Sequence, residues 1–199
     1  PGLEVPAVCA DYTRNFVLPQ PASKPDAVPV IFFPGSTVGN FAPADAEIFL
    51  QRIAALIRGG DLLIGVDLKK DAAILNAAYN DKGGVTAAFN LNLLARANRE
   101  LGADFDLGAF SYVPFWDGAM ERMDLRLRSE APQHVRIPGA DLELDLALGE
   151  EIRVEISTKF RTHLIAEELT EAGFGVERVW DDGDGVPTGD FALTLARRR

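Results

Sequence analysis

Two short apolar runs with a helical pattern between them restrict the fold of this chain more than any other feature. Residues 28–33 (VPVIFF) and 62–66 (LLIGV) contain no charged side chain. Strands that are apolar on both sides are typical of parallel sheets with both faces covered. Apolar residues at helical spacing predict the helix between the runs: Phe49, Leu50, Ile53, Leu56 and Ile57. This strand–helix–strand order predicts an α/β fold.

The middle of the chain follows a different pattern. Two helices are predicted at 70–79 and 86–101, the second with an apolar face formed by Phe89, Leu93, Ala97 and Leu101. Apolar and polar residues then alternate with period two, which is typical of half-buried antiparallel strands. The alternating segments are 122–128, 142–148 and 152–157.

The α/β pattern returns after residue 157, with a helix followed by strands at 175–180 and 191–196. We therefore predict an α+β lobe inserted into an α/β core. The predicted boundaries are 1–67 and 158–199 for the core and 68–157 for the lobe.

Composition excludes several classes of protein. With 47% hydrophobic residues, the 199-residue chain can bury a sizeable core, and its net charge of −10 would repel a nucleic acid. No apolar run approaches the roughly 20 residues of a membrane helix, and no signal peptide is visible, so we expect a cytoplasmic protein without a membrane partner. The single cysteine, Cys9, excludes an intramolecular disulfide, and its apolar neighbours predict a buried thiol. Nothing indicates the oligomeric state.

The glycine-containing loop at residues 35–39 (GSTVG) lies between a predicted strand and a predicted helix. α/β-Hydrolases carry their nucleophilic serine in such a turn, but the middle residue here is Thr37, which disfavours a hydrolase. A sharp loop at the carboxyl end of a parallel strand is nevertheless a place where α/β sheets bind ligands. One cysteine and two separated histidines, His134 and His163, predict no metal site.

Glu155 and Ser157 are two residues apart on a predicted strand, so we expect both on one face. Ile152, Val154 and Ile156 are predicted on the other face. From the residues alone, a solvated strand edge explains the polar pair better than a binding site does. Asn40 and Tyr79 are open to both interpretations as well.

Six stretches in order resemble the histidine Nα-methyltransferases of ergothioneine biosynthesis and their relatives that act on other amino acids. The stretches are FPGSTVGNF (33–41), LIGVDLKKD (63–71), AYND (78–81), GVTAAFNLNLL (84–94), NREL (98–101) and EEIRVEISTKF (150–160). The resemblance spans nearly the whole chain. It implies a class I, Rossmann-like methyltransferase sheet with a substrate-binding lobe, and S-adenosylmethionine (SAM) as the cofactor.

The resemblance also implies roles for individual residues. Asp11 and Tyr12 match an acidic–aromatic pair that holds the adenine of the cofactor. Residues that match substrate-binding positions are Asn40 and Tyr79 for the backbone end of the amino acid, and Glu155 and Ser157 for the imidazole. No catalytic residue is assigned, and the chemistry requires no metal, because methyl transfer to an amine depends on position and electrostatics.

Two departures from the family pattern bear on function. Leu125 stands at a substrate-pocket position where the histidine enzymes have Met. The family's glycine-rich loop and ribose-binding acid should lie before Pro1, so we expect an N-terminally incomplete methyltransferase sheet that is inactive by itself. The resemblance predicts an N-methyltransferase acting on histidine; the alternatives are another amino acid such as tryptophan, or a relative that binds amino acids without catalysis.

Overall fold

A computed structural model of the chain describes residues 5–14, 17–19, 27–57, 59–182 and 189–198. The chain divides into two compact units. Unit 1 comprises Pro1–Leu68 together with Phe160–Arg199, and unit 2 is the continuous segment Lys69–Lys159. Among the described residues, no helix is both long enough and apolar enough to cross a membrane.

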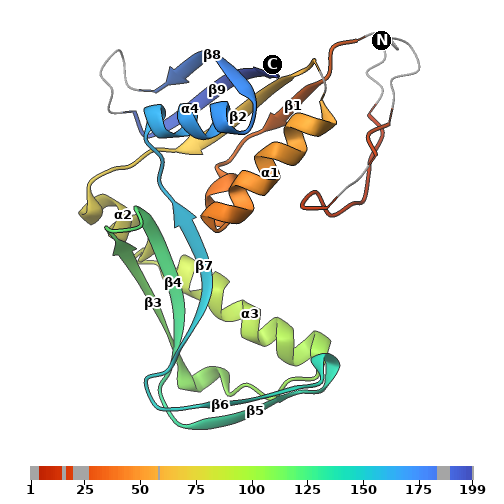
Figure 1. Cartoon of the computed structure of the whole chain (residues 1–199). Coiled ribbons are helices and arrows are strands. Elements are labelled where there is room, and N and C mark those ends of the chain that lie inside the picture. Colours follow the sequence, from red (N-terminus) through yellow and green to blue (C-terminus); the bar gives the residue numbers. More distant parts are fainter. Residues whose placement is uncertain (1–4, 15–16, 20–26, 58, 183–188, 199) are drawn as a thin grey trace. The chain divides into compact units, whose positions relative to one another are not determined.

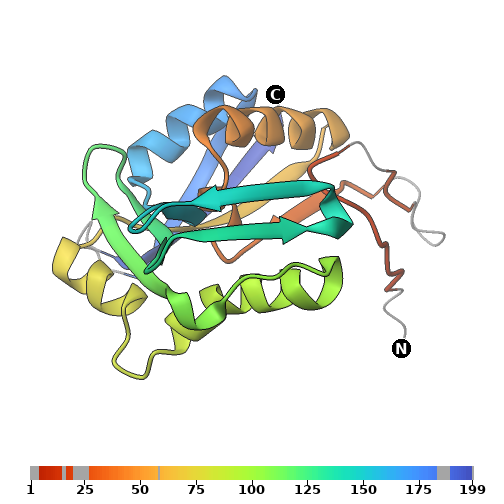
Figure 2. The same cartoon turned by 90° about the horizontal axis from the view of Figure 1, so that it is seen from below.

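Unit 1 is built on a four-stranded mixed sheet, which confirms the prediction of an α/β fold. Its strands, in spatial order, are β1 (Val30–Phe33), β2 (Asp61–Asp67), β9 (Phe191–Arg198) and β8 (Phe174–Asp181). β1 and β2 are parallel, whereas β9 is antiparallel to both of its neighbours. Helices α1 (Pro43–Leu56) and α4 (Thr162–Glu171) lie on the same face of this sheet (Figures 1 and 2).

The core of unit 1 lies between these helices and the sheet. Phe49, Leu50 and Ile53 of α1 pack against Ile64 of β2 and Ile165 of α4. Burying such side chains contributes about 1.5–3 kcal/mol each. Ile31 and Phe33 of β1 also pack against this apolar core, just before the loop that leads to α1.

Two expectations for the N-terminal part were wrong. β1 was predicted to be buried on both faces, but Val30 and Phe32 are 58% and 62% exposed. β1 is the edge strand of the described sheet, and its alternate side chains point away from the helices that cover the other face. Cys9 is also exposed rather than buried, because the apolar run around it forms no strand here.

Unit 2 consists of a three-stranded antiparallel sheet, a separate hairpin and two helices. The sheet has the order β3 (Phe110–Asp117), β4 (Arg122–Ser129), β7 (Glu151–Thr158), and the hairpin pairs β5 (Gln133–Ile137) with β6 (Leu142–Leu146). The helices are α2 (Ala72–Tyr79) and α3 (Val85–Leu101). The described residues also form three short 3-10 turns: η1 (Thr37–Asn40), η2 (Leu107–Ala109) and η3 (Pro138–Ala140).

The core-facing side of α3 agrees with the predicted one at Ala97, which packs against the core of unit 2, and differs at the other three predicted residues. Phe89, Leu93 and Leu101 are 68%, 44% and 41% exposed, whereas Leu94 is 5% exposed and packs with Phe105 in the core. The apolar spacing allowed either face of this helix. The sheet and the hairpin of unit 2 supply the apolar surface that selects the Leu94 side.

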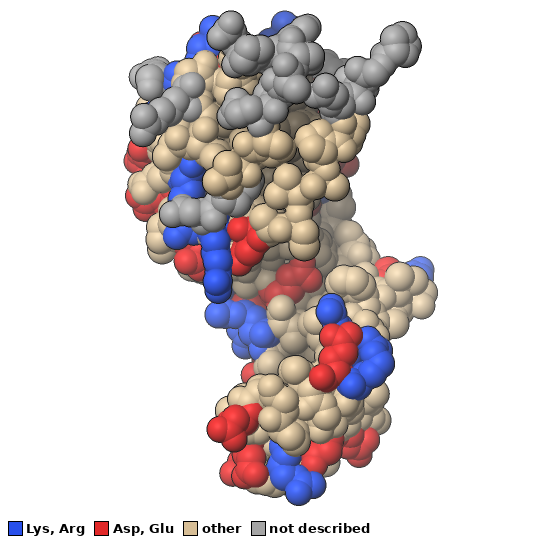
Figure 3. Space-filling view, turned by 90° about the vertical axis from the view of Figure 1, so that its right-hand side faces the viewer, with Lys and Arg blue, Asp and Glu red and all other residues tan. Residues whose placement is uncertain are grey.

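The alternation predicted for β4 is confirmed, and it separates an apolar face from a charged one. Met123, Leu125 and Leu127 are 0–1% exposed. On the opposite face Asp124, also 0% exposed, accepts a hydrogen bond from Arg126 at 2.7 Å, and Arg126 bridges to a further acid, Glu151. The face of the molecule in Figure 3 also carries basic and acidic side chains next to one another.

Candidate functional site

The loop after β1 is a tight turn at the carboxyl ends of β1 and β2. Gly35 and Ser36 both have positive φ (78° and 58°), a conformation that costs little for glycine and more for serine. Ser36 is held there by its amide, which donates to the Gly65 carbonyl (3.1 Å), and by its Oγ, which accepts from the Asp67 amide (2.9 Å). The turn leads into η1, which ends at the exposed residue Asn40.

Asp11 and Tyr12 have the chemistry that an adenine requires. Asp11 Oδ1 accepts from the Thr13 hydroxyl (2.6 Å) and amide (2.9 Å), and these hydrogen bonds lower the pKa of this exposed carboxyl. The Tyr12 ring is 44% exposed and meets Phe33 and Phe49 edge-on, with centroids 5.9 and 6.1 Å apart. A carboxylate that accepts from an exocyclic amine and an aromatic ring that packs on a flat apolar face suit the adenine end of SAM.

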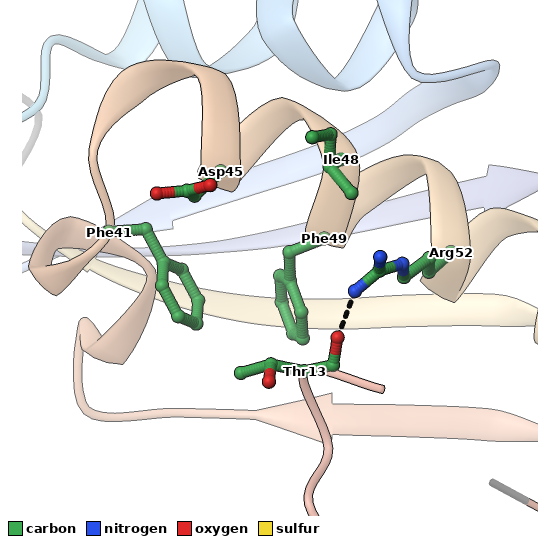
Figure 4. Close-up of a pocket in the computed structure, with 6 residues that line it drawn as sticks. All are labelled: Thr13, Phe41, Asp45, Ile48, Phe49 and Arg52. Atoms are coloured by element: carbon green, nitrogen blue, oxygen red, sulfur yellow. Dashed lines mark hydrogen bonds between the residues drawn. The ribbon is translucent and has the colours of Figure 1, made fainter. Parts of the chain in front are cut away.

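A pocket of about 320 Å³ lies between this segment and α1 (Figure 4). Phe41, Phe49 and Ile48 give it an apolar wall, and Asp45 lies at the amino-terminal end of α1. The Arg52 guanidinium donates to the Thr13 carbonyl, so α1 holds the segment that carries Asp11 and Tyr12. The pocket of unit 1 is therefore lined by both apolar and polar side chains, and Asp11 and Tyr12 directly precede its lining residue Thr13 in the sequence.

The register between β4 and β7 places the predicted substrate residues of unit 2 on one face. Leu125 lies directly opposite Glu155, and Met123 lies opposite Ser157. Directly paired residues point to the same side of a sheet, and Met123 and Leu125 pack against Leu75 of α2. Glu155 and Ser157 therefore face α2.

The remainder of β7 departs from the predicted alternation. The pairing shifts between Leu125 and Arg126, where β7 carries an additional residue, and Ile152 is paired with Leu127. Because Leu127 and Leu125 share a face, Ile152 lies on the same face as Glu155 and not on the opposite one as predicted. A β-bulge changes the phase of a strand in this way, and such bulges are frequent beside functional sites.

Three polar side chains form a closely bonded group on this face, which we call the Lys159 cluster: Tyr79, Ser157 and Lys159. Lys159 Nζ donates to Tyr79 Oη (2.7 Å) and to Ser157 Oγ (2.8 Å), and Tyr79 Oη lies 2.9 Å from Ser157 Oγ. Ser157 is 7% exposed and Lys159 is 2% exposed. The polar residues on this face are therefore partners in a buried network and not a solvated strand edge.

Glu155 is a half-buried carboxylate next to this cluster. Burial raises its pKa, and the positive charge of Lys159 opposes that rise. Tyr112 of β3 donates from its hydroxyl to the Tyr79 carbonyl (3.2 Å). Burial, followed by the charge of Glu155, raises the pKa of Tyr112, so this phenol stays protonated and can donate.

The structure brings together four of the seven predicted site residues: Tyr79, Leu125, Glu155 and Ser157. Asp11, Tyr12 and Asn40 belong to unit 1. Sequence reasoning missed Lys159 and Tyr112. Lys159 follows Glu155 and Ser157 at the same two-residue spacing, one position after the end of β7. This continued polar spacing was the signal in the sequence that could have identified Lys159.

Comparisons with known proteins identify relatives over the whole chain. A sequence model described as "Histidine-specific methyltransferase, SAM-dependent" matches residues 1–198. Histidine N-alpha-methyltransferase from Mycolicibacterium smegmatis is 46% identical over 100% of this chain and 60% of its own length. The protein of the same name from Mycobacterium tuberculosis is 44% identical over 99% of this chain and 59% of its own length.

The chain spans about 60% of the length of these two relatives. A solved structure, an S-adenosylmethionine-dependent methyltransferase from Clostridium acetobutylicum, is similar with a TM-score of 0.48 and 8% identity. It covers 96% of this chain and 63% of that one. The family model and the two relatives each match nearly the full length of this chain, and the chain belongs to the histidine-specific, SAM-dependent methyltransferase family.

Proposed function

We propose that this protein acts in the SAM-dependent methylation of the α-amino group of histidine, as a cytoplasmic enzyme. The observation that carries the proposal is the position of Glu155 beside the Lys159 cluster, on the α2-facing side of β7. A family description that names histidine, and two curated relatives with the same named substrate, support it.

The polar groups of unit 2 suit an imidazole. A carboxylate accepts from a ring N–H, and a serine hydroxyl can bond the second ring nitrogen. Leu125, which is 1% exposed and opposite Glu155, closes the apolar side of this face. Within unit 2 we assign Tyr79 to the backbone end of the substrate, as the family resemblance implies.

The described residues of unit 1 suit the adenine part of the cofactor. Asp11 would accept from the exocyclic amine and Tyr12 would pack against the ring. When it is bound, SAM supplies a methyl group on a sulfonium that an amine can attack. The protein then holds the amine in line with the methyl group, and such positioning lowers the barrier of the reaction.

The reaction is tested by incubating the full gene product with SAM and a panel of amino acids, and by reading the products by mass spectrometry. We expect methylated histidine, with the added mass on the α-amino nitrogen in the fragment spectrum. Preferential methylation of tryptophan would show that tryptophan, and not histidine, is the substrate. Binding of histidine without any methylated product would contradict the enzymatic function.

A further inference from the structure

Lys159 is a buried side chain whose ammonium group contacts two residues of the proposed substrate face, Tyr79 and Ser157. Its Nζ lies 4.8 Å from the centre of the Tyr79 ring, in addition to its hydrogen bonds to Tyr79 Oη and Ser157 Oγ. Burying a charged side chain is costly unless it makes such bonds. The hydrogen bonds to Tyr79 and Ser157 therefore offset part of the cost of burying Lys159.

Those bonds determine the direction of every hydrogen bond in the cluster. An ammonium group donates and never accepts, so Tyr79 Oη and Ser157 Oγ both act as acceptors toward Lys159. The Tyr79 hydroxyl in turn donates a hydrogen bond to Ser157 Oγ, because a phenol is a stronger donor than an alcohol. A hydroxyl oxygen has two lone pairs, and both lone pairs of Ser157 are now occupied. Ser157 is left with its hydrogen, and it can only donate to a third partner.

We propose that Lys159 is a positioning residue that makes Ser157 a hydrogen-bond donor, so that Glu155 and Ser157 together select the neutral form of an imidazole ring. This inference rests on the proposed function. A neutral imidazole has one N–H, which Glu155 accepts, and one unprotonated nitrogen, which accepts from Ser157. An imidazolium would direct a second N–H at Ser157, whose lone pairs are already used.

The groups around Ser157 that could also respond to pH come from three parts of unit 2. Tyr79 and Asp81 lie at the end of α2 and in the loop after it, Tyr112 lies on β3, and Glu155 and Lys159 lie in and just after β7. A test of the ring's protonation must therefore be insensitive to their titration and to that of the substrate's α-amine.

A competition between two substrates meets this requirement. The second substrate is 1,2,4-triazol-3-ylalanine, which keeps an N–H and an unprotonated ring nitrogen but is much less basic than histidine. The ratio of the two kcat/KM values cancels the protein groups and the α-amine. We expect the ratio to turn against histidine by about tenfold between pH 7.5 and 5.5, following a ring pKa near 6.5. A ratio constant within twofold, or rejection of the triazole by the wild-type protein, would contradict the proposal.

Variants test whether Lys159 is the cause. Lys159→Met should raise the KM for histidine about tenfold, leave kcat within about threefold, and flatten the pH dependence of the competition ratio, because Ser157 can then accept. Lys159→Arg retains a donor and should keep the pH dependence. If Lys159 acts through Ser157, Lys159→Met combined with Ser157→Ala should match Ser157→Ala alone within about twofold. Additive losses, or an unchanged pH dependence in Lys159→Met, would contradict the proposal.

Folding and function are separated by two controls. Thermal unfolding and calorimetric titration of SAM should be similar in wild type and Lys159→Met. If Lys159→Met does not fold, the wild-type competition still tests whether the neutral ring is selected, and loss of the pH dependence in Lys159→Arg would contradict the role of Lys159. Absence of histidine methylation in the wild type would overturn the proposed function, whereas active wild type with a pH-independent ratio would overturn this inference alone.

Discussion

Among single residues, Glu155 has the most direct predicted effect on the substrate. Glu155→Ala removes the acceptor for a ring N–H from a half-buried position. We therefore expect kcat/KM for histidine to fall roughly thirtyfold to a thousandfold, which corresponds to a loss of about 2–4 kcal/mol of transition-state stabilisation. Cofactor binding should not change. Glu143→Ala, at an exposed carboxylate of β6, is the matched control and should leave kinetics unchanged. Histidine kinetics within twofold of wild type would remove Glu155 from the site.

Asp11 provides the corresponding test for the cofactor. Asp11→Ala should raise the dissociation constant of SAM about tenfold or more, with a smaller effect on histidine, because a charge-assisted hydrogen bond is lost. Isothermal titration with SAM measures this. Glu47→Ala, an exposed carboxylate on α1 in the same unit, should bind SAM like the wild type. A change confined to histidine affinity would show that Asp11 is misassigned.

At the scale of elements, Leu75 is the side chain of α2 that is buried against the sheet of unit 2. Leu75 is 2% exposed and packs on Met123 and Leu125, while its neighbour Ile74 is 58% exposed. Leu75→Ala should lower the free energy of unfolding by about 2–5 kcal/mol. The KM for histidine should also rise, because α2 carries Tyr79. Ile74→Ala should change both by little; equal effects of the two variants in denaturant titrations would contradict this packing.

The start of α3 gives a prediction for pH. Asp81 accepts from the amides of Thr86 (2.9 Å) and Val85 (3.0 Å), and these bonds lower its pKa from 3.8 to about 2. A carboxylate with a lowered pKa stabilises the fold above about pH 4, and this contribution is lost as pH falls toward 2. The melting temperature of Asp81→Ala should therefore lie below that of wild type at pH 7 and converge with it in acid. A difference independent of pH would exclude this cap.

At the scale of the whole molecule, each of the two units has an apolar core of its own among the described residues. Every member of the two clusters around Leu94 and Met123 belongs to unit 2, and every member of the cluster around Ile64 belongs to unit 1. Because a segment with its own core can fold alone, we expect an excised 69–159 fragment to unfold cooperatively, with a near-ultraviolet signal. Leu127→Ala in that fragment should weaken or abolish the transition. A non-cooperative wild-type fragment would show that unit 2 depends on the rest of the chain.

Some properties of this protein followed from the sequence by itself. The continuous apolar runs at 28–33 and 62–66 and the two-residue alternation of β4 are local features of the sequence. They predicted these strands without any knowledge of the residues that pack against them. The positions of Tyr79, Glu155 and Ser157 were found through the ordered family motifs. These motifs identify residues without placing them next to one another.

Only the tertiary structure decided which side chains meet. The bulge in β7 depends on its pairing with β4, and it moved Ile152 to the face of Glu155. The choice of the Leu94 side of α3, and the exposure of Phe32, depend on which apolar surfaces lie nearby. Buried Lys159 donates a hydrogen bond to Tyr79 of α2, which lies 80 residues earlier in the chain. Local periodicity carries no information about partners so distant in sequence, and the directional bonds of the site are formed between such partners.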